Sequence, residues 1–202
     1  MTKILELPLQ QLDWAAVQAL KDEYPNAIFR VESDFPSTAA PMDEDQFWSI
    51  IALLDWSKDQ EDDILAPSIF ALSKLSDESI FGFHELLNQK LFALDARKYA
   101  EQLGSNRFAP AEGNFFSVDD FLYSRCGVIA NGRQFFEEVL ETPSLILKEF
   151  TFESLLYVPE KAWEAKHSNV DYDYFPVTSY ETFSNIAGWP GMRPLQDRLN
   201  KR

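Results

Sequence analysis

The sequence predicts a mainly α-helical fold, a multi-helix bundle of about five to six helices with a small N-terminal strand–helix–strand unit and an irregular aromatic C-terminal tail. Three observations favour this fold. Apolar side chains recur every three or four residues between residues 43 and 166, as on one face of a helix. Helix-capping signals precede several of these stretches. Finally, 46% of the 202 residues are apolar, including 17 Phe, 7 Tyr and 5 Trp, which is enough to build a core.

The N-terminal residues predict two short strands around one helix. Apolar residues alternate at Lys3–Leu9 and Ala27–Glu32, and a helical period runs through Asp13–Tyr24 before Pro25. A linker rich in Pro, Ser and Ala follows at Ser33–Pro41. We therefore expect three parts: an N-terminal appendage with its linker at 1–41, a helical domain at 42–168, and a tail at 169–202 that packs on the bundle.

Three helices are expected in the first half of the helical domain. Asp43, with Gln46 three residues later, has the pattern of a capping box that opens the first helix. The second helix is expected at about Asp62–Leu75. Ser76 caps the third, whose apolar residues continue to Gly104 and predict one long helix.

The second half of the helical domain begins after a loop at Ser105–Phe116. Ser117 then opens a capping box, and the helix that follows is interrupted at Gly132 before its apolar pattern resumes. Thr142 and Pro143 form a further helix-start signal. A last core helix is expected from Thr151 to Lys166, before the aromatic tail.

The charge balance excludes several classes of function. The chain has 33 acidic and 18 basic residues, a net charge of −15, which disfavours nucleic acid and anionic membrane surfaces as partners. No apolar run reaches the length of a membrane span, and the single Cys126 can form no intramolecular disulfide. We therefore expect a cytoplasmic protein.

An acidic region at Asp43–Asp63 is the densest feature of the sequence, with eight acidic residues and one lysine. Carboxylates that could bind a hard cation or a basic partner protein are Asp55, Asp59, Glu61, Asp62 and Asp63. The region lacks the glycine and the residue order of a calcium-binding EF-hand loop, so a solvated corner between two helices is favoured. The alternatives that stay open are a divalent-cation site on these carboxylates and a surface that steers a basic protein.

A second candidate site combines Arg125 and Asp119, while Trp48 beside the first apolar stripe is a further candidate binding residue. In one interpretation Arg125 holds a carboxylate or phosphate ligand. In the other it closes a structural ion pair inside the bundle with a carboxylate such as Asp119, Glu101 or Glu153. We favour the structural interpretation, because the acidic start of this helix would repel an anionic ligand.

Several core residues also carry a family resemblance. They are Phe47-Trp48-x-Ile50, Leu72, Leu75, Ile80 and Phe83, the run Ser117-x-Asp119-Asp120-Phe121-x-x-x-Arg125-x-x-Val128-Ile129-x-x-Gly132-Arg133, and Glu153 with Tyr157-Val158. On these residues, the stretch from about Met42 to Lys166 resembles a bacterial family of uncharacterised helical domains, domain of unknown function 4240. Gly127 stands where that pattern commonly has Trp. The resemblance implies a mostly helical, cytoplasmic bacterial domain, and no activity comes with it.

The sequence holds none of the usual catalytic or nucleotide-binding motifs. His84-Glu85 lacks the second histidine of a zinc-protease helix, and no glycine-rich phosphate loop or nucleophile elbow is present. We therefore predict a non-enzymatic, acidic protein-binding module without a cofactor or metal that holds a basic partner protein. One concrete version is an immunity-like or antitoxin-like role. The alternative is an enzyme or small-ligand-binding domain with an anion pocket at Arg125.

Overall fold

The computed structural model describes residues 42–104 and 117–190, together with Gln18, Ala19 and Asp22, and the statements below concern these residues. The chain divides into two units, residues 1–36 and 37–202, and the helical domain belongs to the second. The predicted strand–helix–strand unit at 1–41 lies outside the described residues, apart from those three positions.

The described part of the second unit is all helical. It contains seven α-helices and no strand, against the expected five to six helices. The helices are α2 (Glu44–Ile51), α3 (Glu61–Ser73), α4 (Asp77–Ala93), α5 (Arg97–Ala100), α6 (Val118–Ala130), α7 (Arg133–Glu141) and α8 (Val158–Lys166). Short 3₁₀ turns lie at Glu101–Leu103, Pro143–Leu145, Glu153–Tyr157 and Ile186–Gly188. None of the helices among these residues is long and apolar enough to cross a membrane.

The predicted capping residues begin three of these helices. Asp43 accepts a hydrogen bond from the main-chain N–H of Gln46 at 2.7 Å, at the start of α2. Ser76 and Ser117 accept the corresponding bonds at the starts of α4 and α6. These side chains satisfy N–H groups that have no partner inside the helix, which fixes where each helix starts.

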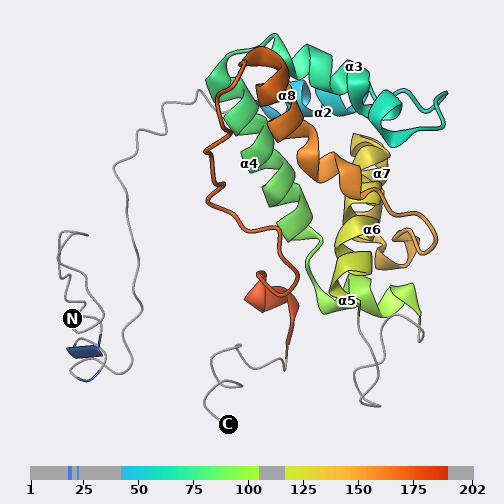
Figure 1. Cartoon of the computed structure of the whole chain (residues 1–202). Coiled ribbons are helices and arrows are strands. Elements are labelled where there is room, and N and C mark those ends of the chain that lie inside the picture. Colours follow the sequence, from blue (N-terminus) through green and yellow to red (C-terminus); the bar gives the residue numbers. More distant parts are fainter. Residues whose placement is uncertain (1–17, 20–21, 23–41, 105–116, 191–202) are drawn as a thin grey trace. The chain divides into compact units, whose positions relative to one another are not determined.

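The helices pack around α4. Helix α3 lies along α8, and α4 contacts both α8 and α6 (Figure 1). The buried side chains between them include Phe47 from α2, Phe83 from α4, Phe121 from α6 and Leu155 from the turn before α8. This single core holds the surface elements that carry the candidate sites.

Two predicted helices are divided in the structure. The expected long helix from Ser76 to Gly104 ends at Ala93, and α5 begins only at Arg97 after a break at Asp95. The expected helix from Thr151 starts as a 3₁₀ turn and becomes α-helical at Val158. Proline has no N–H to donate to the preceding turn, so Pro159 near the start of α8 suits a helix that begins there.

The chain returns along α4 after α8. We call residues 170–189 the strap; they lie beside α4 as an extended segment that ends in a turn (Figure 1). From 171 to 180, exposed residues alternate strictly with partly buried ones. The alternation is the period of an extended chain with one side against the bundle.

Candidate functional site

The first candidate site is the acidic corner, defined here as Asp55–Asp63, which connects α2 to α3. Asp59 and the three acids that open α3 are exposed, and Asp55 is partly exposed. The three acids in the first turn of α3 interact favourably with the helix dipole, because the N-terminal end of a helix is its positive end. The sequence therefore places a dense negative charge on the surface at this corner.

Part of this charge is used to hold the domain together. Asp62 pairs with Lys161 of α8 at 2.5 Å, and Glu61 accepts a hydrogen bond from the hydroxyl of Ser154. The hydroxyl of Ser57 donates to Asp55 at 2.6 Å, and this bond, with a second from the main-chain N–H of Ser57, lowers the pKa of the Asp55 carboxyl. These acids have structural partners already.

Asp59 and Asp63 differ from their neighbours. Both are exposed, and within residues 42–104 and 117–190 neither forms an ion pair or a side-chain hydrogen bond. Their charges are therefore available to a group outside the domain. A solvated carboxylate keeps most of its attraction for a cation that arrives from solution, because it has no internal partner to give up.

A half-exposed tryptophan lies in the same corner. The side chain of Trp56 is 47% exposed. Its ring contacts Phe152 at 5.2 Å and Phe150 at 5.9 Å between ring centroids, and Phe152 is itself buried. The two phenylalanines hold the indole against the domain while its other side faces solvent. A held aromatic side chain loses little further freedom when a partner covers it.

Trp48, the other candidate tryptophan, does not contribute to this surface. It is only 7% exposed, and its ring packs against Phe47 and Phe136. The structure therefore corrects its expected role as a binding residue. Trp48 follows Phe47 on α2, and the core covers both rings because α7 supplies Phe136 to the second of them.

No metal centre is formed by the described side chains. In residues 42–104 and 117–190, no three His, Cys, Asp or Glu side chains come close enough together to share an ion. Three carboxylates of the acidic corner bond instead to separate partners: Asp55 to Ser57, Glu61 to Ser154 and Asp62 to Lys161.

Arg125 and Asp119 do not form one site. They are six residues apart on α6, which places them on different sides of the helix, and Asp119 is exposed while Arg125 is fully buried. The guanidinium donates to the carbonyl oxygens of Leu91 and Tyr180 at 2.9 and 3.1 Å. It also donates to the hydroxyl of Thr182 at 2.9 Å.

These contacts correct the expected ion pair. Arg125 has carbonyl and hydroxyl partners in place of Asp119, Glu101 or Glu153, and its ring neighbour is Phe121, 4.7 Å from the guanidinium carbon to the ring centroid. Burial lowers the pKa of Arg125 to about 10, while the nearby charge of Asp95 opposes that shift. The side chain is a positive group that ties the strap to α4, with no face open to a ligand from solution.

Asp95 is a buried charged residue whose role was not predicted from the sequence. It is fully buried directly after α4, and its carboxylate accepts hydrogen bonds from main-chain N–H groups of Phe183 and Asn185 and from the indole of Trp189. The sequence does hold one sign of its burial, because this acidic residue directly follows Leu94 at the end of the apolar face of the helix. Its partners lie about 90 residues later, so their spacing could not be read from the sequence.

The remaining titratable candidates are His84, which is partly buried, and Cys126, which is fully buried. His84 accepts or donates a hydrogen bond at 2.9 Å with the hydroxyl of Tyr172, and burial lowers the pKa of His84 to about 4. Burial likewise raises the pKa of the Cys126 thiol to about 12, so that cysteine stays protonated at neutral pH. Neither group offers an activated nucleophile.

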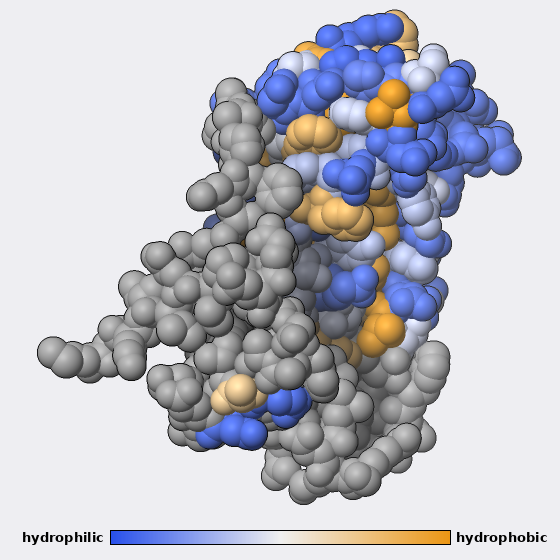
Figure 2. Space-filling view, turned by 60° about the vertical axis from the view of Figure 1, so that its left-hand side comes forward, coloured by the Kyte–Doolittle hydropathy of each residue, from blue (hydrophilic) through white to orange (hydrophobic). Residues whose placement is uncertain are grey.

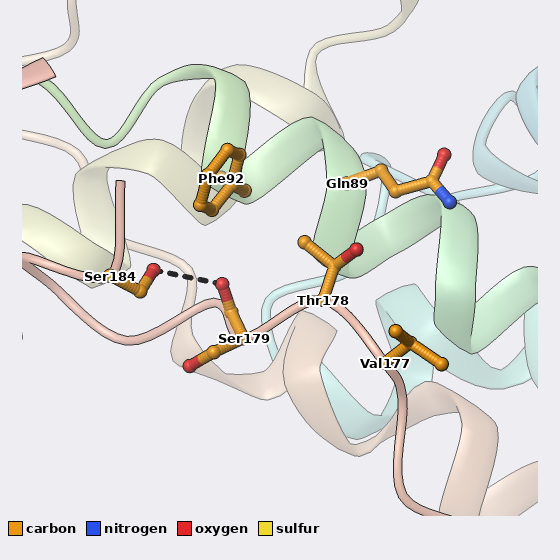
Figure 3. Close-up of a pocket in the computed structure, with 6 residues that line it drawn as sticks. All are labelled: Gln89, Phe92, Val177, Thr178, Ser179 and Ser184. Carbon is orange, nitrogen blue, oxygen red and sulfur yellow. Dashed lines mark hydrogen bonds between the residues drawn. The ribbon is translucent and has the colours of Figure 1, made fainter. Parts of the chain in front are cut away.

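A pocket of about 430 Å³ lies between α4 and the strap. Figure 3 shows Gln89 and Phe92 on α4 facing strap residues, with the hydroxyl of Ser184 donating to the carbonyl oxygen of Ser179. The lining carries no charged side chain: it consists of Gln89, Phe92, Val177, Thr178, Ser179 and Ser184. The pocket is therefore a gap under the strap without the charged groups of a catalytic centre.

On the face shown in Figure 2, the described surface is mostly hydrophilic. In Figure 2, hydrophobic residues form separate islands among hydrophilic ones on the face shown. An interface on such a face would combine polar contacts with isolated apolar anchors.

Comparison with known proteins identifies one family. The family model described as a protein of unknown function (DUF4240) matches residues 42–165, more than half of the chain. The match confirms the resemblance found on the core residues and nearly reproduces its expected bounds. No curated protein and no solved structure matches the chain.

Proposed function

The chain belongs to the family of proteins of unknown function DUF4240, and we propose that it is a non-enzymatic protein-binding module that captures a basic partner protein through the acidic corner. The observation that carries the proposal is Trp56, a half-exposed indole packed on Phe152. The same short segment holds two exposed carboxylates that have no side-chain partner among the described residues, Asp59 and Asp63. An immunity-like or antitoxin-like role in the cytoplasm, in which the domain covers a basic toxin, is the concrete form of this function.

The chemistry of the corner suits arginine or lysine on the partner. A cation can lie on the open face of an indole while a neighbouring carboxylate completes its charge, and both interactions strengthen when the partner excludes water. The surrounding net negative charge increases the rate of encounter with a basic surface, most strongly at low salt. The aromatic ring supplies binding energy, and the carboxylates supply the preference for a positive partner.

The alternative function, an enzyme or small-ligand domain with an anion pocket at Arg125, has less support. Such a pocket needs a guanidinium that faces solvent, and Arg125 is fully buried with its terminal nitrogens bonded to the chain. A positive partner for the corner requires no such rearrangement.

A direct test uses an arginine-rich peptide as the probe. Binding of a fluorescent peptide of alternating glycine and arginine is measured by anisotropy with the wild-type chain and with two variants, Trp56→Ala and Asp59→Asn/Asp63→Asn. We expect each variant to weaken binding at least about tenfold, which corresponds to ~1.4 kcal/mol. Affinity of the wild-type chain should fall as salt rises through the range in which exposed charges are screened.

The matched control removes the same number of charges elsewhere. Glu78→Gln/Glu141→Gln neutralises two exposed carboxylates at distant positions of the domain. If this control weakens peptide binding as much as the corner variants do, the peptide senses only the total charge and the corner is not the site. The same three variants, used as bait with a basic candidate toxin, extend the test to a protein partner.

A further inference from the structure

The inward side of the strap fixes it to the bundle. The hydroxyl of Tyr172 shares a hydrogen bond with His84 at 2.9 Å, and the hydroxyl of Tyr174 donates to Glu85 at 2.7 Å. The ring of Tyr174 also stacks on Phe81, with 4.4 Å between the ring centroids. These contacts hold the extended segment in one position, so its other side is presented to solvent in a fixed arrangement.

The outward side of the strap carries two acidic and two apolar side chains in a row. Asp171, Asp173, Phe175 and Val177 are all exposed and stand at every second position of the extended chain. Phe175 is 83% exposed and Val177 is 94% exposed, more than any other large apolar side chain that the structure describes. Neither aspartate forms an ion pair or a side-chain hydrogen bond with the described residues.

The main chain beneath this row is unpaired. Between residues 171 and 175, no main-chain N–H or C=O group forms a hydrogen bond with the part of the chain that the structure describes. The nearest bonded groups are the carbonyl oxygen of Val170, which accepts the indole N–H of Trp163 at 2.9 Å, and the N–H of Val177, which Glu85 accepts at 2.7 Å. An extended segment with unpaired main-chain groups has the properties of an edge strand.

We propose that residues 171–177, which we call the strap edge, bind an extended basic segment of a partner protein as an added β-strand. Main-chain hydrogen bonds would supply affinity, and the outward row would select the sequence. Side chains directly opposite each other on paired strands are in contact, so the partner should carry Lys or Arg opposite Asp171 and Asp173 and apolar residues opposite Phe175 and Val177. The strap itself stays in place.

The charge of the chain favours a basic partner over a second copy. Each copy has a net charge of −15, and pairing of two strap edges would bring further aspartates together. Charged side chains on an edge strand are a common means of preventing self-pairing. The same two aspartates attract a basic strand, because opposite charges on neighbouring strands stabilise their pairing.

The anchored strap also lowers the cost of binding. An extended segment that the bundle already holds loses little conformational freedom when a second strand pairs with it. The strap edge is distinct from the acidic corner, which connects α2 to α3. This proposal therefore holds or fails independently of the function proposed for that corner.

The test uses a synthetic strand with the pattern that the strap edge predicts. In this fluorescent peptide threonine alternates first with two valines and then with two lysines, so antiparallel pairing places the lysines opposite the aspartates. Binding is followed by anisotropy. We expect Asp171→Asn/Asp173→Asn and Phe175→Ala/Val177→Ala each to weaken binding at least about tenfold, and a peptide with glutamate in place of lysine to bind at least about tenfold more weakly to the wild-type chain.

The matched control removes the same charge from the acidic corner. Asp59→Asn/Asp63→Asn should change the affinity for this peptide by less than about threefold, because the peptide contacts the strap edge alone. If this variant weakens binding as much as Asp171→Asn/Asp173→Asn does, the peptide senses only the total charge and the proposal is overturned.

Hydrogen exchange shows whether the peptide pairs as a strand. In the wild-type chain, binding should slow the exchange of alternate main-chain N–H groups between residues 171 and 175, because one edge of a strand uses every second residue. Peptides N-methylated at the threonines, or at the valines and lysines, should differ in affinity by at least about tenfold, since only one set faces the strap edge. Binding without slowed exchange, or equal affinity of both methylated peptides, overturns the proposal.

A second copy is tested by sedimentation of the wild-type chain. We expect a monomer that binds the peptide. A dimer that becomes monomeric in Phe175→Ala/Val177→Ala would assign the strap edge to self-association and overturn the proposal. Circular dichroism verifies that the variants are folded, and the exchange measurement on the wild-type chain decides the matter if they are not.

Discussion

At the scale of single residues, two buried charged side chains, Arg125 and Asp95, attach the strap to the bundle. Arg125 and Asp95 are both fully buried, and both terminal nitrogens of Arg125 and both carboxylate oxygens of Asp95 form hydrogen bonds. A charged group in a protein interior is costly unless such partners satisfy it. The same two residues therefore stabilise the fold only while the strap is in place.

Replacing Arg125 should be strongly destabilising. Arg125→Met removes hydrogen bonds to Leu91, Tyr180 and Thr182 and leaves the buried carboxylate of Asp95 without its neighbouring positive charge. We expect the free energy of unfolding to fall by about 3–5 kcal/mol, as when one partner of a buried charged network is removed. Urea unfolding followed by circular dichroism measures it.

The control for this variant is an exposed arginine. Arg97 pairs with Glu101 one helical turn away, and both side chains are about half exposed. Arg97→Met should cost less than about 0.5 kcal/mol, because exposed pairs of this kind contribute little. Equal losses for Arg125→Met and Arg97→Met would contradict the role assigned to the buried guanidinium.

His84 should make stability depend on pH. Burial lowers its pKa to about 4 in the folded chain, whereas an unfolded histidine titrates near 6.5. Between these values the unfolded chain binds a proton that the folded chain does not, so stability is complete above about pH 6.5 and falls as the pH falls toward 4. His84→Gln removes this dependence.

The measurement compares urea unfolding of both chains from pH 7 to pH 5. The wild-type chain should lose up to about 2 kcal/mol more than His84→Gln over this interval, since one pKa unit corresponds to ~1.4 kcal/mol. Carboxylates titrate in both chains and cancel in the difference. Parallel curves would show that the imidazole at position 84 is accessible to protons in the folded state.

At the scale of secondary structure, two helical glycines lie close to other segments, and substitutions at these glycines would show whether those segments can move. A Cβ on Gly82 of α4 would lie 2.8 Å from the main-chain nitrogen of Met42, while one on Gly127 of α6 would lie 2.9 Å from a ring carbon of Phe150. Phe150 is partly exposed and its ring can move, but the main chain at Met42 cannot do so without moving the start of α2. Gly82→Ala should therefore cost about 1–3 kcal/mol through overpacking, partly offset by ~1 kcal/mol of helix propensity.

Gly127→Ala is the matched comparison. The same gain in helix propensity applies, and displacement of the Phe150 ring relieves the close contact, so we expect a change within about 1 kcal/mol. Thermal unfolding of both variants decides the matter. A larger loss for Gly127→Ala than for Gly82→Ala would mean that Phe150 is held as firmly as the backbone is.

Local signals in the sequence predicted the helix starts. The features that were not predicted, the break after α4 and the burial of Trp48, depend on contacts between residues far apart in the chain. Asp43, Ser76 and Ser117 act on N–H groups three residues away, so their capping roles are visible in the sequence. The break after α4 is different, because Asp95 is held by residues about 90 positions later. Trp48 was misjudged for the same reason: its cover, Phe136, lies on a distant helix.

At the scale of the whole molecule, the net charge of −15 divides into acids with and without a structural role. Glu61 binds Ser154 in the turn before α8, and Asp62 binds Lys161 of α8. In the described part of the chain, the side chains of Asp59 and Asp63 form no ion pair or hydrogen bond. Only the position of the acidic corner could be predicted from the sequence. Which of its carboxylates are paired depends on α8 and the turn before it, about 90 to 100 residues away.

This division predicts effects of different size on stability. Glu61→Gln/Asp62→Asn should lower the free energy of unfolding by up to about 1 kcal/mol, as expected for exposed pairs. Asp59→Asn/Asp63→Asn should change it by no more than about 0.3 kcal/mol, because relief of repulsion between unpaired like charges offsets the loss of the interaction of Asp63 with the dipole of α3. Urea unfolding at about 20 mM salt, where screening is weak, compares the two. A loss for the second pair equal to the first would assign Asp59 and Asp63 a structural role.

The position of the strap in the chain also sets the order in which the protein can be completed during synthesis. Asp95 and Arg125 emerge from the ribosome long before Phe183, Asn185 and Trp189, which are 88 to 94 residues beyond Asp95. Contacts so distant along the chain close late, because a long loop must be brought together first. A nascent chain that already holds α2 to α8 but not yet residues 180–189 therefore still lacks the groups to which buried Asp95 and Arg125 bond in the finished fold.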